Sequence, residues 1–256
     1  MSTPEHDPSI AHEPHLRGLP FRPDPSEETA KNDWLCRDPA AVDEDRAEQS
    51  VWDEPGFSAA LAGPPPPDAW TYCRWLQQRR AATTAAQSWG VTGAIALLAG
   101  PVAILSAFLS VGYHTYFAVV NLTVIGPLIE EVGKVAAALW VIEKRPYLFT
   151  SRLQIGCCVV AGGLVFAGIE NLLYLHVYLP EASPLLVLWR WTVCVALHTG
   201  CSLVAGLGLM RVWHRTMTTW TKANLSLAVP FLMAAVVIHG LYNGMALLLE
   251  GTVFRF

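Results

Sequence analysis

Five long apolar stretches constrain this chain more than any other feature of its sequence. They lie at residues 90–112, 116–142, 155–178, 185–211 and 227–250. Each is long enough to cross the ~30 Å hydrocarbon core of a bilayer as a helix, which takes about 20 residues. Average soluble domains carry roughly 25% charged residues, whereas this chain carries 15%. The sequence therefore predicts an all-α polytopic membrane protein with about five transmembrane helices.

The first 68 residues differ in character from the rest. They hold 15 of the 21 acidic residues and end in a run of prolines. Such a segment buries too little apolar surface to offset the entropy of ordering, so we expect a disordered acidic tail. Residues 69–88 interleave Trp and Tyr with Arg, as is typical of a juxtamembrane segment in the headgroup layer. Residues 89–256 form the predicted transmembrane domain.

Lys and Arg gather in alternate loops of the predicted domain. They precede the first stretch, follow the second and follow the fourth, whereas the other two loops hold none. The positive-inside rule then places the N-terminus in the cytoplasm and the C-terminus outside, in the cell (inner) membrane. Arg190 is the exception, and its neighbours Trp189 and Trp191 lead us to expect that it reaches the outer headgroup layer.

Six ionisable residues lie deep inside the apolar stretches, away from their ends. They are Glu130, Glu131, Lys134, Glu170, His198 and His239. An ionisable group at mid-membrane costs at least ~2.5–3.5 kcal/mol, so it should face a protein interior or a water-filled cavity. From the helical rise, one member of each of the last four stretches lies roughly 18–22 Å from the cytoplasmic end. We therefore expect helices two to five to form a bundle around one polar site.

Each of these residues also has a structural interpretation. Glu130 and Lys134 are four residues apart and can form a buried ion pair on one helix face, with Glu131 about 100° away. A single histidine in a membrane helix often only bonds a neighbouring helix. Three carboxylates and two imidazoles in one layer exceed what packing requires, which favours a functional site.

Four short motifs occur in order on four separate stretches. They are EExxK (Glu130, Glu131, Lys134), FxxxEN (Phe166, Glu170, Asn171), a lone histidine (His198) and HxxxN (His239, Asn243). In this respect the chain resembles the PrsW-type family of intramembrane proteases over roughly residues 116–250. That family is similar to the wider group of CAAX prenyl endopeptidases and bacteriocin-linked membrane proteins. Lys134 and Glu170 distinguish this chain from that wider group, whose patterns resemble EExxxR and FxxxH.

The resemblance implies an intramembrane endopeptidase that hydrolyses a peptide bond of a membrane-anchored protein. It further implies a single-pass membrane substrate such as an anti-sigma factor, in regulated proteolysis. The expected partners are thus the membrane and that substrate, and no nucleic acid is expected.

Two mechanisms stay open at this stage. In a metal-free mechanism Glu130 or Glu131 is the general base, and Glu170 sets the tautomer of a histidine. The amide of Asn243 and the imidazole of His239 then stabilise the oxyanion. His198 orients the water or protonates the leaving amine.

In a metal-dependent mechanism two imidazoles and a carboxylate, from His198, His239 and Glu170, hold one zinc ion beside a glutamate base. No HExxH motif lies in the apolar stretches, so we expect the metal-free version. Two other functions fit the same residues. Intramembrane Glu and His also build the relays of ion- or proton-coupled transporters, and a polar layer can serve helix association in a non-catalytic scaffold.

Overall fold

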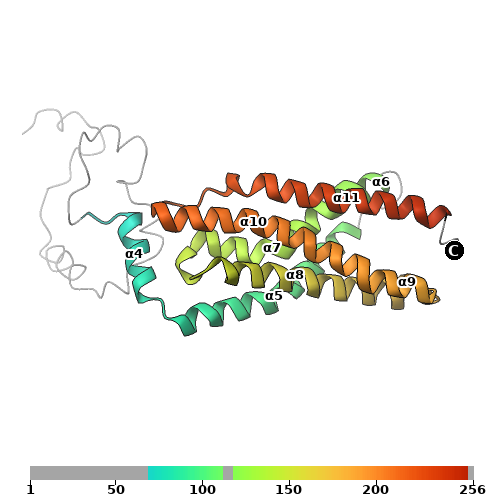
Figure 1. Cartoon of the computed structure of the whole chain (residues 1–256), viewed down its shortest axis with the longest axis horizontal. Coiled ribbons are helices and arrows are strands. Elements are labelled where there is room, and N and C mark those ends of the chain that lie inside the picture. Colours follow the sequence, from blue (N-terminus) through green and yellow to red (C-terminus); the bar gives the residue numbers. More distant parts are fainter. Residues whose placement is uncertain (1–68, 112–117, 253–256) are drawn as a thin grey trace, which may run out of the picture. The chain divides into compact units, whose positions relative to one another are not determined.

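The computed structural model describes residues 69–111 and 118–252 of the chain, and within them it contains helices and no strand (Figure 1). The predicted acidic tail lies outside the described residues. Every described element belongs to one compact unit. The prediction of an all-α protein is confirmed for this part of the chain.

The elements follow one another with short connections. In chain order they are α4 (Tyr72–Ala82), α5 (Ala85–Val111), α6 (Ala118–Val120), the π-helical turn η4 (Asn121–Ile125), α7 (Gly126–Lys144), the 3-10 turn η5 (Pro146–Leu148), α8 (Arg152–Leu173), the π-helical turn η6 (Tyr174–Tyr178), α9 (Pro184–Trp189), the π-helical turn η7 (Arg190–Cys194), α10 (Val195–Thr219), the 3-10 turn η8 (Leu225–Leu227) and α11 (Val229–Thr252).

Three continuous helical segments are long and apolar enough to cross a membrane. They are Arg152–Tyr178, Pro184–Thr219 and Leu225–Leu249. The segment Ala85–Leu98 of α5 is also apolar, but it is shorter than these three segments. Helix α7 is more polar because it carries Glu130, Glu131 and Lys134 in its middle and Glu143 and Lys144 at its end. The count of five spans therefore stays a prediction.

The base of the bundle is fixed by side chains that close the loop between α7 and α8. Ser151 caps α8 through a capping box with Gln154, whose Nε2 donates to Ser88 Oγ at 2.7 Å on α5. Arg80 on α4 donates to the carbonyl oxygens of Tyr147 and Phe149 at 3.3 and 2.9 Å. These bonds satisfy backbone groups that the loop leaves free, and they hold α4 against the start of α8.

Small residues let the helices approach closely where the polar residues lie. On α8, a Cβ added to Gly163 would lie 2.8 Å from Thr199 Cα of α10, next to His198. On α11, a Cβ added to Gly240 would clash with the carbonyl oxygen of Thr123 in η4. Glycine at these positions allows backbones to pack against one another, as is usual between membrane helices. The site described below depends on both approaches.

We expect Gly240→Ala to destabilise the protein by about 1–3 kcal/mol or more, because the added methyl group meets backbone that cannot move aside cheaply. Gly244→Ala is the matched control on the same helix, since its Cβ would lie 3.6 Å from Thr123 Cγ2 in ordinary contact. Unfolding in a detergent and denaturant titration measures both. Equal stability of the two variants would show that α11 and η4 do not pack as described.

Candidate active site

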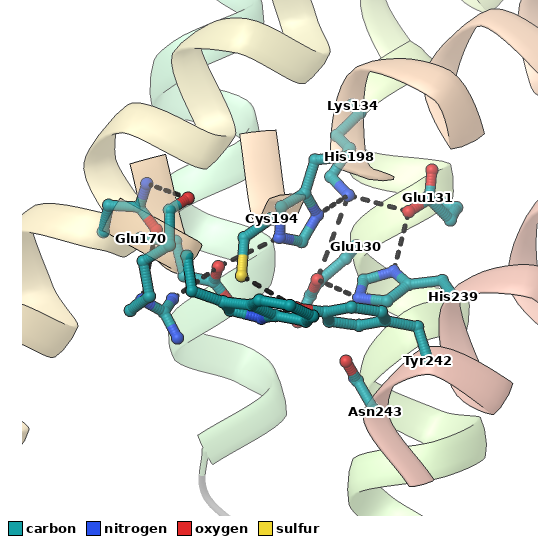
Figure 2. Close-up of polar contacts among 12 residues, drawn as sticks. Glu130, Glu131, Lys134, Glu170, Cys194, His198, His239, Tyr242 and Asn243 are labelled. Atoms are coloured by element: carbon teal, nitrogen blue, oxygen red, sulfur yellow. Dashed lines mark hydrogen bonds and ion pairs between the residues drawn. The ribbon is translucent and has the colours of Figure 1, made fainter. Parts of the chain in front are cut away.

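The structure brings the residues of all four motifs into one place (Figure 2). Helix α7 supplies Glu130, Glu131 and Lys134, α8 supplies Phe166, Glu170 and Asn171, α10 supplies His198, and α11 supplies His239 and Asn243. Glu170 and Asn171 lie in the last turn of α8 and His198 lies in the first turn of α10, so the π-helical extensions η6 and η7 continue these two segments past the site.

Glu131 is the most buried carboxylate of the site. Its Oε1 accepts hydrogen bonds from Lys134 Nζ at 2.7 Å and from His239 Nδ1 at 2.8 Å. With the proton on Nδ1, His239 keeps a lone pair on Nε2, which lies 3.7 Å from Glu130 Oε2. Glu131 thus orients His239 so that its free nitrogen faces Glu130.

Lys134 pairs more closely with Glu131 than with Glu130, contrary to the expected pair at a spacing of four. Its Nζ lies 2.7 Å from Glu131 Oε1 and 4.0 Å from Glu130 Oε2. Residues three and four apart are both neighbours on a helix, so spacing alone does not choose between them. The ammonium group also lies 4.2 Å from the centre of the Phe166 ring. It therefore offsets two carboxylates while it stays away from the hydrocarbon.

The contacts of His198 define its tautomer. Lys134 Nζ lies 3.0 Å from His198 Nδ1, and an ammonium group can only donate. His198 Nδ1 therefore accepts, and the ring proton sits on Nε2, which donates to Glu170 Oε2 at 2.9 Å. The rings of His198 and His239 meet edge to face, with their centroids 4.9 Å apart.

Arg190 is the residue that the sequence analysis misplaced. Its Nη2 donates to Glu170 Oε2 at 3.0 Å and its Nε donates to Asn171 Oδ1 at 3.1 Å, so it points into the bundle and the expectation of an outer headgroup contact was wrong. Its neighbour Trp189 also turns inward and donates to Tyr242 Oη at 2.8 Å. The sequence does contain a signal for this contact. Arg190 is a cation and Glu170 an anion in neighbouring apolar stretches, and each needs a partner of opposite charge.

Two asparagines bond backbone carbonyls of π-helical turns. Asn243 Nδ2 donates to the carbonyl oxygen of Leu122 in η4 at 3.0 Å, and Asn171 Nδ2 donates to that of Arg190 in η7 at 2.9 Å. A π-helical turn interrupts the regular i to i−4 bonding of a helix, and such turns occur frequently at functional sites. In Figure 2 no dashed contact joins Asn243 to the other side chains of the site. Because Asn243 Nδ2 donates to the Leu122 carbonyl oxygen, one of its two amide hydrogens is not available for the expected oxyanion.

The side chains of the site differ in their exposure. The side chains of Glu131 and Lys134 are fully buried, and that of His239 is 1% exposed. By contrast, the side chains of Glu130 and Glu170 are 11% and 19% exposed. Anything that reaches the site from outside the bundle therefore meets these two carboxylates first.

One group of side chains has the composition of a metal site. The ligand atoms of Glu130, His198 and His239 all lie within 4.8 Å of one another. Two imidazoles and one carboxylate form the ligand set of several catalytic zinc sites. Glu130 Oε2 is buried and has no hydrogen-bond partner among the described residues. These residues therefore fit a metal ion.

The carboxylate partners of both histidines agree with this fit, whereas a metal ion on His198 would have to replace the contact of Nδ1 with Lys134 Nζ. Histidine ligands of metals almost always donate their other ring N–H to a carboxylate, a carbonyl or water, and here Glu131 accepts from His239 and Glu170 accepts from His198. Glu170, which the sequence analysis placed among the ligands, is not a member of the group. Its position beside His198 instead resembles that of a carboxylate that orients a ligand.

Comparison with known proteins gives one match. Residues 78–255 match the family model described as PrsW family intramembrane metalloprotease. The matched segment contains every residue of the site. No curated protein and no solved structure matches the chain.

Proposed function

The chain belongs to the PrsW family of intramembrane metalloproteases, and from this premise we propose that it hydrolyses a peptide bond of a membrane-anchored protein at the Glu130–His198–His239 group. One observation carries the proposal. Two carboxylate–imidazole pairs, Glu131–His239 and Glu170–His198, converge on Glu130, whose buried Oε2 lacks a hydrogen-bond partner among the described residues. Burying an unpaired carboxylate oxygen is costly, which favours a ligand at this position over a purely structural role. Glu131 Oε2 is also buried without a hydrogen-bond partner among the described residues, but Glu131 is held through Oε1 by Lys134 and His239.

Peptide hydrolysis breaks an O–H bond of water and the C–N bond of the substrate and forms a C–O bond. Without a metal ion, Glu130 would take the proton from the attacking water and return it to the leaving amine. His239 Nε2, held toward Glu130 by Glu131, orients that water. Lys134 offsets the negative charge of the glutamates near the developing oxyanion.

In the metal-dependent version, Glu130, His198 and His239 would instead hold the metal ion that the family description names, and Glu130 would then be a ligand and not the general base. When bound, such an ion would act as a Lewis acid on the scissile carbonyl and lower the pKa of a bound water. The ligand set and the carboxylate partners of both histidines support this version over the metal-free one that the missing HExxH motif favoured.

We further propose that the substrate is a single-pass membrane protein such as an anti-sigma factor. This rests on the resemblance of the four motifs. The proposed setting is a multi-pass protein of the cell (inner) membrane, with its N-terminus in the cytoplasm and its C-terminus outside. The alternating basic loops support that orientation.

A comparison of membrane-protein fragments tests the proposed function. Cells that produce the wild-type protein should accumulate cleavage fragments of at least one membrane-anchored protein, and cells that produce Glu130→Gln at equal level should not. Purified wild-type protein in liposomes should then cut that substrate without other proteins. Identical fragment patterns in the two strains would contradict the proposal.

We expect purified protein to bind about one zinc ion per chain, and chelation to remove both the metal and the activity. His239→Ala should weaken zinc binding strongly, because it removes a ligand. His214→Ala on α10 is the matched control, since His214 is exposed and lies outside the Glu130–His198–His239 group. Metal analysis and competition with a chromophoric chelator measure binding without any substrate. Full activity in metal-free protein would restore the metal-free mechanism.

A further inference from the structure

We propose that Arg190 is a positioning residue of the reaction, which holds Glu170 against His198 and so fixes the tautomer and orientation of His198. Arg190 belongs to none of the four motifs. Its effect on turnover rests on the proposed function, whereas its effect on His198 does not.

Arg190 and His198 share one oxygen atom as their hydrogen-bond acceptor. Glu170 Oε2 accepts from Arg190 Nη2 at 3.0 Å and from His198 Nε2 at 2.9 Å. A carboxylate held by one hydrogen bond can rotate about its side chain, whereas one held by two donors at the same oxygen has a fixed direction. Arg190 thus determines where the acceptor of the His198 proton lies.

Arg190 is itself held at both its backbone and its side chain. Asn171 Oδ1 accepts from Arg190 Nε at 3.1 Å, and Asn171 Nδ2 donates to the Arg190 carbonyl oxygen at 2.9 Å. The guanidinium group also lies over the Tyr174 ring, 3.7 Å from its centre. The rigid fork of a guanidinium group suits two acceptors at fixed positions. The side chain of Arg190 in η7 is therefore held in a fixed position relative to Glu170 and Asn171 of α8.

The second ring nitrogen of His198, Nδ1, also has a partner. Lys134 donates to Nδ1, so the ring can accept there only while its proton stays on Nε2. If Glu170 turned away, the Nε2 proton would lose its acceptor, and the ring would be free to rotate or to change tautomer. For a histidine in the Glu130–His198–His239 group, that change would misplace the nitrogen that serves the reaction.

A simpler alternative is that Arg190 only neutralises the charge of Glu170. A cation inside an apolar stretch does need a partner, and Glu170 supplies one at 3.0 Å. Charge alone, however, requires neither the Nε bond nor the contact of Asn171 with the carbonyl oxygen. The two interpretations differ for Arg190→Lys, which keeps the charge and loses the fork.

The experiment uses full-length protein in detergent with 15N-labelled histidine, and the His198 signals are assigned by comparison with His198→Gln. Wild-type protein should show a single tautomer with the proton on Nε2. Arg190→Gln should show exchange between tautomers or a changed ring environment, and Arg190→Lys should show the same change to a smaller extent. Thr192→Val is the matched control in the same π-helical turn, because its exposed hydroxyl bonds only the carbonyl oxygens of Leu188 and Trp189. It should leave the His198 signals unchanged.

Turnover of the substrate identified by fragment mapping provides the second measurement. Arg190→Gln should lower kcat by about 10–100-fold, the usual effect of losing a partner that orients a ligand histidine, with little change in KM. On a Glu170→Gln background the same substitution should add little, because Arg190 acts through Glu170. Wild-type His198 signals in Arg190→Gln, or full recovery of kcat and of the signals by Arg190→Lys, would overturn the proposal. If the wild-type protein cuts no substrate, the proposed function fails while the histidine signals still decide the role of Arg190.

Discussion

Glu130→Gln is expected to lower kcat by about 10²–10⁴-fold, the usual contribution of a general acid–base group, while the protein stays folded. Glutamine keeps the size of the side chain and removes the charge with which Glu130 would take a proton from water or hold a metal ion. Folding should tolerate the change, because Glu130 Oε2 accepts no hydrogen bond from the described residues and lies 4.0 Å from Lys134 Nζ. Steady-state cleavage in liposomes and thermal unfolding in detergent measure the two effects.

The matched control for this variant lies on the same helix. Glu143 is 41% exposed and pairs with Lys144 at 3.7 Å, so Glu143→Gln changes the charge of α7 by the same amount outside the site. It should leave kcat within about twofold of wild type, because an exposed ion pair contributes little. If both variants lowered kcat equally, the loss in Glu130→Gln would reflect the charge of the helix and not proton transfer. Wild-type turnover in Glu130→Gln would remove Glu130 from the proposed mechanism.

The convergence of the site was predictable, because it follows from helix geometry alone. Polar residues at similar depth on adjacent membrane helices must meet, since a lone ionisable group in hydrocarbon is costly. Glu130, Glu170, His198 and His239 were placed in one layer on this ground, and the structure brings them together around one point.

The pairing within the layer was not predictable from the same information. Spacing allowed Lys134 to pair with Glu130 or with Glu131, and the choice depends on His239, which lies 108 positions farther along the chain than Glu131. The role of the Asn243 amide depends on η4, because its Nδ2 bonds the Leu122 carbonyl oxygen. A π-helical turn has no simple sequence signature, so neither contact can be found by periodicity. Where a tertiary contact decides between two partners that the sequence makes equally possible, the choice is known only from the three-dimensional structure.

The direction of Arg190 has a similar explanation. Flanking tryptophans usually mark the edge of a membrane span, where the long side chain of arginine reaches the headgroups. Here Trp189 bonds Tyr242 on α11 and Arg190 bonds Glu170 on α8. The need of Glu170 for a partner outweighs the edge preference, because a buried ion pair left half complete costs about 3–5 kcal/mol. When a sequence places opposite charges inside neighbouring spans, an ion pair between them should therefore be considered before either charge is assigned to the headgroup layer.

Lys134→Met is expected to lower the free energy of unfolding by about 3–5 kcal/mol, which is the usual effect of removing one partner from a buried ion pair. Glu131 is fully buried and would keep a carboxylate that only His239 contacts. Lys144→Met is the matched control at the end of the same helix, where the exposed pair with Glu143 makes a change within about 0.5 kcal/mol the expected result. Denaturant titration in detergent measures all variants.

The double variant Lys134→Met/Glu131→Gln separates charge balance from catalysis. With both charges gone, the fully buried carboxylate of Glu131 is no longer left unpaired, so much of the stability lost in Lys134→Met should return, although Glu130 still loses the cation 4.0 Å away. Activity should stay low, because His239 loses the carboxylate that directs its Nε2 toward Glu130. A double variant no more stable than Lys134→Met would mean that Lys134 stabilises the protein through His198 and Phe166, not through Glu131. Recovery of activity together with stability would show that the Glu131–His239 bond serves folding alone.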